Sequence, residues 1–193
     1  MKGDKLFIEH YEPRLYAQGI ENVVLRHYTH VQGFATDDPD NSTRLIFTPR
    51  GEVDARLDAL SVLYGSEFGV SITSLVSHKT EQKWLFLLDC SLSVSRKHEQ
   101  VLLEALRASR HALPALKSGM LLRTVNSYHV VGFVPLSKDE WQRHMAQAIL
   151  LHTATGKVIA DVRYIGHCLE RSYGSLRLTD YLGKPTPDFV CEI

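Results

Sequence analysis

Residues 84–89 read Trp-Leu-Phe-Leu-Leu-Asp, and residues 127–134 read Ser-Tyr-His-Val-Val-Gly-Phe-Val. Each stretch is a nearly continuous apolar run, which is typical of a strand buried on both faces. Each also holds a polar residue where an apolar one would be less costly to bury, Asp89 in the first and His129 in the second. The two stretches therefore predict two buried strands, joined by a helix-like segment, each with a polar residue that is a candidate for function.

The sequence around these runs predicts a mixture of strands and helices. Residues 120–124 and 127–134 are separated by a short polar segment, which predicts a hairpin. Ser137 and Glu140 form a capping box, so a helix is expected to begin there. The expected strands are 23–33, 44–48, 70–76, 84–88, 120–124, 127–134, 176–181 and 189–191, the expected helices are 6–22, 52–64, 96–111, 137–153 and 161–169, and the clearest loop and turn are 36–42 and 77–82. This pattern lacks strict strand–helix alternation and favours an α+β fold.

Composition narrows the class of protein. The chain has 193 residues, of which 44% are hydrophobic and 23% charged, as expected for one soluble domain. Its net charge of zero argues against binding nucleic acid by bulk basic attraction. The odd count of three cysteines, without CxxC spacing, favours a reducing, cytoplasmic location over a disulfide framework or a zinc site. The N-terminus lacks a signal-peptide core, and no apolar run approaches the roughly 20 residues that span a bilayer.

Three polar residues are candidates for chemistry, and each has a structural alternative. Asp89 closes an apolar strand, where a carboxylate must be paired, hydrogen-bonded or metal-bound, unless the strand simply ends and the side chain is solvated. His129 projects to the same side of its strand as Ser127, although it could equally be a satisfied core histidine. Asp161 follows an apolar pair and precedes an expected helix, so its alternative is a helix N-cap or an exposed acid.

The order of these residues resembles the motifs of the archaeo-eukaryotic primase superfamily, which includes the primase-polymerases. In that family the first motif is a pair of acids at a strand end, the second is Ser-x-His, and the third is an apolar run ending in Asp. The corresponding segments here are Asp89-Cys90-Ser91, Ser127-Tyr128-His129 and Val158-Ile159-Ala160-Asp161. The resemblance covers roughly residues 83–184. It implies one primase-polymerase-like domain, with an RRM-like catalytic half at 81–193, its mixed or antiparallel sheet flanked by helices, packed on a small N-terminal α/β unit at 1–80.

The same resemblance implies a nucleotidyltransferase that acts on nucleotides and DNA or RNA. Asp89 and Asp161 would hold Mg²⁺ or Mn²⁺, since these ions prefer oxygen ligands, and together with His129 they would form the catalytic set. Ser127 and His129 would contact the nucleotide phosphates. Three basic residues could add phosphate contacts, with plain surface charge as the alternative; they are Arg171, Arg177 and Lys184. A helicase or accessory domain on another chain is a possible partner, and a membrane is not expected.

The chain departs from the family pattern at Ser91, which stands where the second acid of the first motif belongs. Serine is a poor metal ligand and brings no negative charge, and the following loop holds no acid before Glu99. Two-metal catalysis is therefore expected to be weakened or abolished. The alternative function is a catalytically inactive nucleic-acid-binding or protein-interaction module of the same fold.

Other catalytic patterns fit less well. His-Val-x-Gly-Phe occurs twice, at His30 and His129, which suggests a two-histidine phosphoesterase. Such enzymes need Ser or Thr two residues after each histidine, whereas this chain has Gln32 and Val131. Three further constellations lack the required spacing or signature: a histidine metal cluster at His27, His30, His129 and His167, a cysteine nucleophile at Cys90 or Cys168, and a phosphate loop at Gly65, Gly69 or Gly119.

Overall fold

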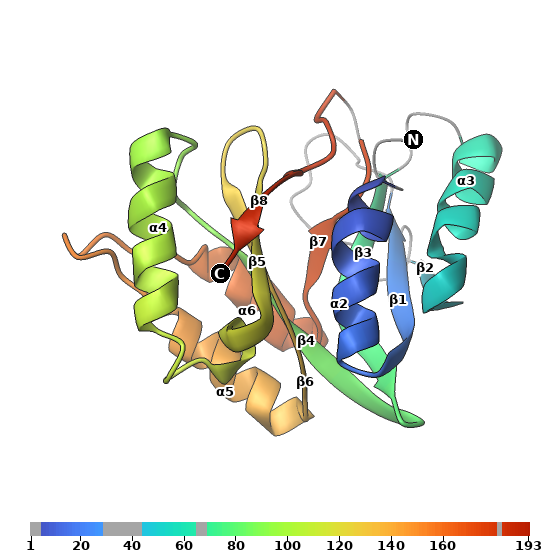
Figure 1. The fold of residues 1–193 in the computed structure, drawn as a ribbon, viewed down its shortest axis with the longest axis horizontal. Helices are drawn as coiled ribbons and strands as arrows, with labels where there is room; N and C mark the ends of the chain where they lie inside the picture. Colours follow the sequence, from blue (N-terminus) through green and yellow to red (C-terminus); the bar gives the residue numbers. More distant parts are fainter. Residues whose placement is uncertain (1–4, 29–43, 65–68, 181–182) are drawn as a thin grey trace.

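The computed structural model describes residues 5–28, 44–64, 69–180 and 183–193 and has an α+β fold (Figure 1). The described strands form one antiparallel sheet of eight strands in the order β2-β1-β3-β4-β6-β5-β8, with β7 paired to β3. The strands are β1 (Ile20–Tyr28), β2 (Arg44–Pro49), β3 (Gly69–His78), β4 (Glu81–Asp89), β5 (Gly119–Arg123), β6 (Tyr128–Leu136), β7 (Ser175–Arg177) and β8 (Asp188–Glu192). The helices are η1 (Phe7–Tyr11), α2 (Glu12–Ala17), η2 (Arg50–Glu52), α3 (Val53–Tyr64), α4 (Arg96–Ala108), η4 (Pro114–Ser118), α5 (Lys138–Ala148) and α6 (Val162–Arg171). Within the described part of the chain, none of them has the length and apolar surface needed to cross a membrane.

The part of strand β4 from Trp84 to Leu88 is apolar because it lies between two hydrophobic cores. Leu85 and Leu87 pack into the core that includes α2 and α3, whereas Phe86 and Leu88 pack into the core that includes α4 and α5. All four side chains are fully buried, and each contributes about 1.5–3 kcal/mol. Figure 1 shows the same division, with α2 and α3 beside β1–β3 and with α4, α5 and α6 around β4–β6. The strand thereby places its last residue, Asp89, where the two halves of the fold meet.

The sheet opens between β3 and β4, and this opening makes room for a cleft. The two strands pair only near their shared turn, through residues 75–78 and 81–84. The other end of β3 pairs with β7 instead, at residues 71–73 and 175–177. The far end of β4 pairs with β6. Because the two strands take different neighbours, they diverge toward the end of β4.

Most expected elements are present, including the hairpin β5–β6 and the capping box at the start of α5. The expected polar turn at 77–82 is shorter, since β3 continues to His78 and β4 begins at Glu81. Lys79 and Thr80, with positive φ angles of 48° and 66°, form the two-residue turn between them. The expected helices at 96–111 and 137–153 end earlier, at Ala108 and Ala148. The expected loop at 36–42 lies outside the described residues.

The expected strand at 176–181 was too long, because β7 has only three residues, 175–177. Arg177 Nη1 donates to the carbonyl oxygens of Thr179 at 3.1 Å and Lys184 at 2.9 Å, and also to that of Pro185. These bonds join the segment after β7 to the chain before β8, while the N–H groups of Leu178 and Thr179 both donate to the carbonyl oxygen of Val70.

Candidate functional site

The ends of β4 and β6 bring three of the candidate side chains together. Asp89 is the cross-strand partner of His129. Asp89 Oδ1 accepts a hydrogen bond from Ser127 Oγ at 3.2 Å and lies 3.8 Å from His129 Nε2. The antiparallel register therefore unites residues that are about 40 positions apart in the chain.

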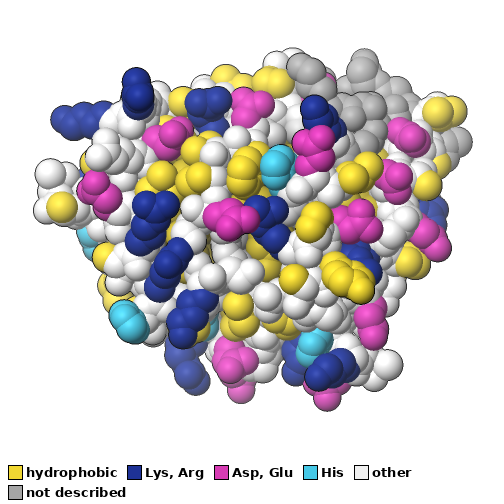
Figure 2. All heavy atoms as spheres, viewed as in Figure 1, with side chains coloured by type: hydrophobic (Ala, Val, Ile, Leu, Met, Phe, Trp, Pro, Cys, Tyr) yellow, Lys and Arg dark blue, Asp and Glu magenta, His cyan; other side chains and the backbone are white. Residues whose placement is uncertain are grey.

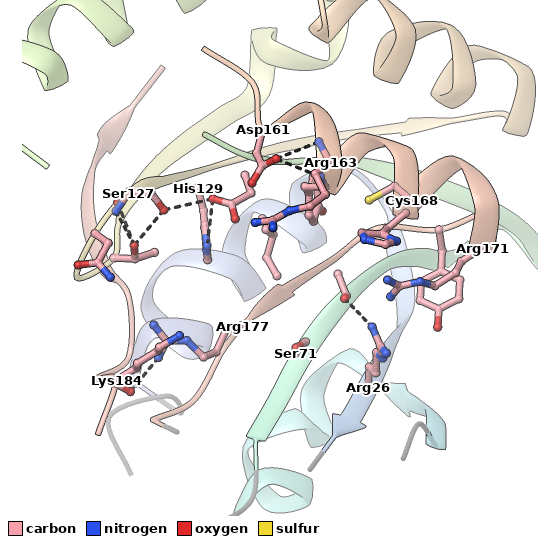
Figure 3. A pocket seen from close by; sticks show the side chains of 18 of the residues that line it. Arg26, Ser71, Ser127, His129, Asp161, Arg163, Cys168, Arg171, Arg177 and Lys184 are labelled. Carbon is pink, nitrogen blue, oxygen red and sulfur yellow. Dashed lines mark hydrogen bonds and ion pairs between the residues drawn. The ribbon is translucent and has the colours of Figure 1, made fainter. Parts of the chain in front are cut away.

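Asp161 joins this group through backbone contacts. Its N–H donates to the carbonyl oxygen of Asp89 at 2.9 Å, next to a bridge between Cys90 and Ala160. The Asp161 side chain also has the structural role that the sequence left open, because Oδ1 accepts the backbone N–H groups of Arg163 and Tyr164 and caps α6 (Figure 3). The other carboxylate oxygen, Oδ2, has no hydrogen bond to a described residue.

The side chain of Ser91 forms hydrogen bonds with the backbone. Its Oγ lies 3.0 Å from the carbonyl oxygen of Val158 and 3.3 Å from that of Ile159, and donates toward them. Its N–H also donates to Ile159 at 2.8 Å. Ser91 does not line the cleft. The position of the missing acid therefore helps to tie the end of β4 to the segment that leads into α6.

The donor set fits one divalent cation rather than two. Asp89 and Asp161 are the acidic residues of the cleft among those described. No group of three or more His, Cys, Asp or Glu side chains in the described ranges is arranged to hold a metal ion. Mg²⁺ commonly uses one or two carboxylates and completes its shell with water and substrate phosphates, so one cation is compatible with this pair. A two-metal site needs more anionic ligands than the two acids provide.

A cleft of about 530 Å³ surrounds the Asp89 centre and extends toward β1, β3 and β7 (Figure 3). That volume is typical of a small-molecule site. Five Lys or Arg side chains line it against two acids, counted over the described residues, and they are Arg26, Arg163, Arg171, Arg177 and Lys184. Arg26 is only 5% exposed and donates from Nη1 to Ser175 Oγ at 3.3 Å. The excess of guanidinium and ammonium groups suits an anionic ligand.

Burial shifts the pKa values of Asp89 and His129 in opposite directions, so that each side chain favours its neutral form. It raises the pKa of Asp89 to about 6, although the hydrogen bond from Ser127 acts in the other direction. It lowers the pKa of His129 to about 3, and the positive charge of Arg177 lowers it further. His129 is therefore neutral at neutral pH, and its contact with Asp89 is not a pairing of full charges. Its Nδ1 is buried without a hydrogen-bond partner among the described residues.

The structure places all the predicted basic residues at the cleft and adds others. Arg171, Arg177 and Lys184 line it, and Arg177 also holds the backbone of Lys184 in place. The sequence reasoning missed several lining residues, among them Arg26, Ser71, Arg163 and Tyr164, and it considered His167 and Cys168 only in other roles, as a metal ligand and as a nucleophile. A signal existed for part of this set, because Arg163, His167 and Arg171 recur every four residues and so share one face of α6.

The alternative constellations gain no support. The first histidine segment of the phosphoesterase hypothesis, His30 with Gln32, lies outside the described residues. Burial raises the pKa of Cys168 to about 11 and that of Cys90 well above its usual value. Both thiols are therefore protonated at neutral pH, which does not suit a nucleophile.

Comparisons with known proteins concern the family and the fold. A family model described as AEP-like, archaeo-eukaryotic primase 1D-like, matches residues 53–184. The crystal structure of the catalytic domain of primase RepB′ in complex with initiator DNA has a similar fold, with a TM-score of 0.55, 13% sequence identity, and coverage of 100% of this chain and 86% of that chain. The crystal structure of primase RepB′ gives a TM-score of 0.55 and 14% identity and covers 96% of this chain, which spans 56% of that longer one. No curated protein matches the chain.

Proposed function

Because the chain belongs to the archaeo-eukaryotic primase family, we propose that it is a primase-polymerase-like nucleotidyltransferase domain whose cleft binds a nucleoside triphosphate and nucleic acid. The observation that carries the proposal is the pairing of Asp89 with His129 beside Asp161, in a cleft lined by five basic side chains. In this proposal residues 1–193 act as one domain, with an N-terminal unit at 1–80 and the motif-bearing unit at 81–193.

The acidic end of the cleft would hold one Mg²⁺ or Mn²⁺ between Asp89 and Asp161. When bound, such an ion lowers the charge on nucleotide phosphates and activates an attacking hydroxyl. Asp89 is suited to this role because its burial disfavours the uncompensated carboxylate, which a cation would relieve. Asp161 would contribute the oxygen that the α6 cap does not use.

The polar groups of β6 and the basic side chains would bind the phosphates. His129 lines the cleft and is neutral, so its imidazole would form a hydrogen bond with a phosphate oxygen rather than an ion pair. Ser127 stands beside it on the same side of the strand and would offer its hydroxyl. Arg171, Arg177 and Lys184, which also line the cleft, would add charge-assisted contacts.

Binding of DNA or RNA is the less direct part of the proposal. The first solved relative is described as a catalytic domain in complex with initiator DNA, which is a property of that protein. The net charge of this chain is zero, and Figure 2 shows acidic and basic side chains interspersed over the face viewed, apart from a row of Lys and Arg at its left. A helicase or accessory domain on another chain would therefore help to hold a template.

A primer-synthesis and primer-extension assay with Mn²⁺ tests the proposal. The unaltered protein is expected to give a metal-dependent product, weak because Ser91 replaces an acid, and Asp89→Ala is expected to abolish it. Asp58→Ala is a matched control, since Asp58 is an exposed acid of α3 outside the cleft. Unchanged product from Asp89→Ala would exclude the catalytic role.

A second candidate is a binding module without turnover, and the structural use of Ser91 favours it. In that case titration with a nucleoside triphosphate or a single-stranded oligonucleotide gives saturable binding, while the Mn²⁺ assay gives no product. Absence of both binding and product would leave a protein-interaction module of the same fold.

A further inference from the structure

The two acids of the cleft have a basic neighbour that the family motifs do not include. Arg163 is the second residue of α6, two positions after Asp161, and its side chain extends into the cleft beside that acid (Figure 3). The positive charge of Arg163 lowers the pKa of Asp89, whereas the negative charge of Asp161 raises it. The guanidinium therefore lies in the cleft beside Asp161 and partly offsets the negative charge of Asp89.

The location of Arg163 is not explained by stability. The residue is exposed, and its side chain forms no hydrogen bond or ion pair within the described ranges. A positive charge in the first turn of a helix opposes the helix dipole, so this place is electrostatically unfavourable. A side chain that is neither packed nor paired, and that faces a functional cleft, is better explained by a ligand.

We propose that Arg163 supplies the positive charge that a second divalent cation would supply in a site with a complete acidic motif, and that it binds a phosphate of the nucleotide directly. The inference rests on the proposed nucleotide-binding function. Loss of the acid at position 91 removes the charge that would hold a second cation, and Ser91 is instead bonded to backbone carbonyl oxygens. A guanidinium stays charged at any physiological pH and matches phosphate with two parallel N–H donors.

A second group in the same cleft supports a phosphate at this place. His129 is only 7% exposed, and its buried Nδ1 has no partner among the described residues. The side chain lines the same cleft as Arg163 and Asp89. A phosphate bound in this cleft would therefore lie among His129, Arg163 and Asp89, with the cation on the carboxylate side.

The test compares Arg163→Ala with the unaltered protein in two titrations. In EDTA, a non-hydrolysable nucleoside triphosphate is expected to bind the variant at least about tenfold more weakly, since a hydrogen bond to a charged group is lost. Without nucleotide, Mn²⁺ is expected to bind the variant several-fold more tightly, since a cation beside two carboxylates is removed. Arg143→Ala is the matched control, because Arg143 is an exposed arginine of α5 outside the cleft, and both of its affinities should be unchanged.

The outcomes separate the inference from the proposed function. Equal nucleotide affinity in EDTA, or unchanged Mn²⁺ affinity, would overturn the role of Arg163 and leave the proposed function intact as long as nucleotide binds with Mn²⁺. No nucleotide binding by the unaltered protein, with or without Mn²⁺, would overturn both. A general structural effect of the substitution would not lower the affinity for nucleotide and raise the affinity for Mn²⁺. Opposite changes in the two affinities are therefore specific to a charge that replaces a cation.

Discussion

Replacing Asp89 by Asn should stabilise the protein at neutral pH while it weakens metal-dependent nucleotide binding. Asn has nearly the same shape and keeps an oxygen that can accept the hydrogen bond from Ser127. It removes the negative charge that burial disfavours. The charge of Asp89 therefore lowers the stability of the folded protein and is needed for metal-dependent nucleotide binding.

The size of the effect follows from the pKa of Asp89. A rise from 3.8 to about 6 corresponds to about 3 kcal/mol, at about 1.4 kcal/mol for each pKa unit. Because the side chain keeps 31% of its surface exposed, solvent screening reduces the expected gain to about 1–2 kcal/mol. Between pH 3.8 and 6 the folded state binds this proton more strongly than the unfolded state, so stability falls as the pH rises through that window and stays lowered above it. The gain from Asp89→Asn should therefore be full at pH 7 and vanish toward pH 4.

Urea denaturation of both proteins at several pH values between 4 and 7.5 measures this difference. Asp58→Asn, an exposed position on α3, should change stability by less than about 0.5 kcal/mol at every pH. Mn²⁺ titration with a nucleoside triphosphate should show a large loss for Asp89→Asn alone. A variant that is less stable than the parent at pH 7, or whose gain does not depend on pH, would refute the desolvated carboxylate and with it the reason why a cation is needed there.

Three further changes probe other parts of the fold. The pKa of His129 is lowered from 6.5 to about 3, so the histidine is protonated in the unfolded state before the folded state as the pH falls. The difference in free energy of unfolding between the unaltered protein and His129→Gln should therefore shrink by about 2 kcal/mol from pH 7 to 5, and a constant difference would contradict this. Gly132→Ala would place a Cβ 2.7 Å from the carbonyl oxygen of Ala115 and should cost about 1–3 kcal/mol by thermal denaturation, whereas Gly166→Ala, with open space in a helix, should stabilise by up to about 1 kcal/mol. Ser137→Ala removes the capping box of α5 and should lower the free energy of unfolding, measured in urea, by about 1 kcal/mol. The same substitution at an exposed serine that caps no helix should have a smaller effect.

The sequence could predict the centre of the site because that centre depends on local patterns. An apolar run that ends in an acid predicts where β4 stops, and period 2 places Ser127 and His129 on one side of β6. The Asp161 cap follows from an acid that precedes a helical pattern. These rules need no knowledge of the register between strands, although only the register shows that Asp89 and His129 are directly opposite each other.

The remainder of the site depends on long-range pairing, which no local pattern specifies. Arg26 reaches the cleft because β1 pairs with β3 and β3 then parts from β4. The short β7 enters that opening and is fixed by the bonds from Arg177, so a pattern that looks like a longer strand stops after three residues. Arg26 is a lone arginine in the central part of β1, and this pattern indicates a buried charge. Its location in the cleft could be inferred only from the order of the strands in the sheet.

The change at position 91 leaves the geometry of the site intact, and this explains how an incomplete motif can persist in an ordered cleft. The chain before α6 is held to the end of β4 by backbone bonds, from Asp161 to Asp89 and from Ser91 to Ile159, and none of these depends on a carboxylate at position 91. The Ser91 hydroxyl adds to that connection by donating to the carbonyl oxygen of Val158. Position 91 can therefore lose its acid without displacing the two that remain. We propose that Arg163, which lines the cleft, supplies the positive charge that a second cation would otherwise bring.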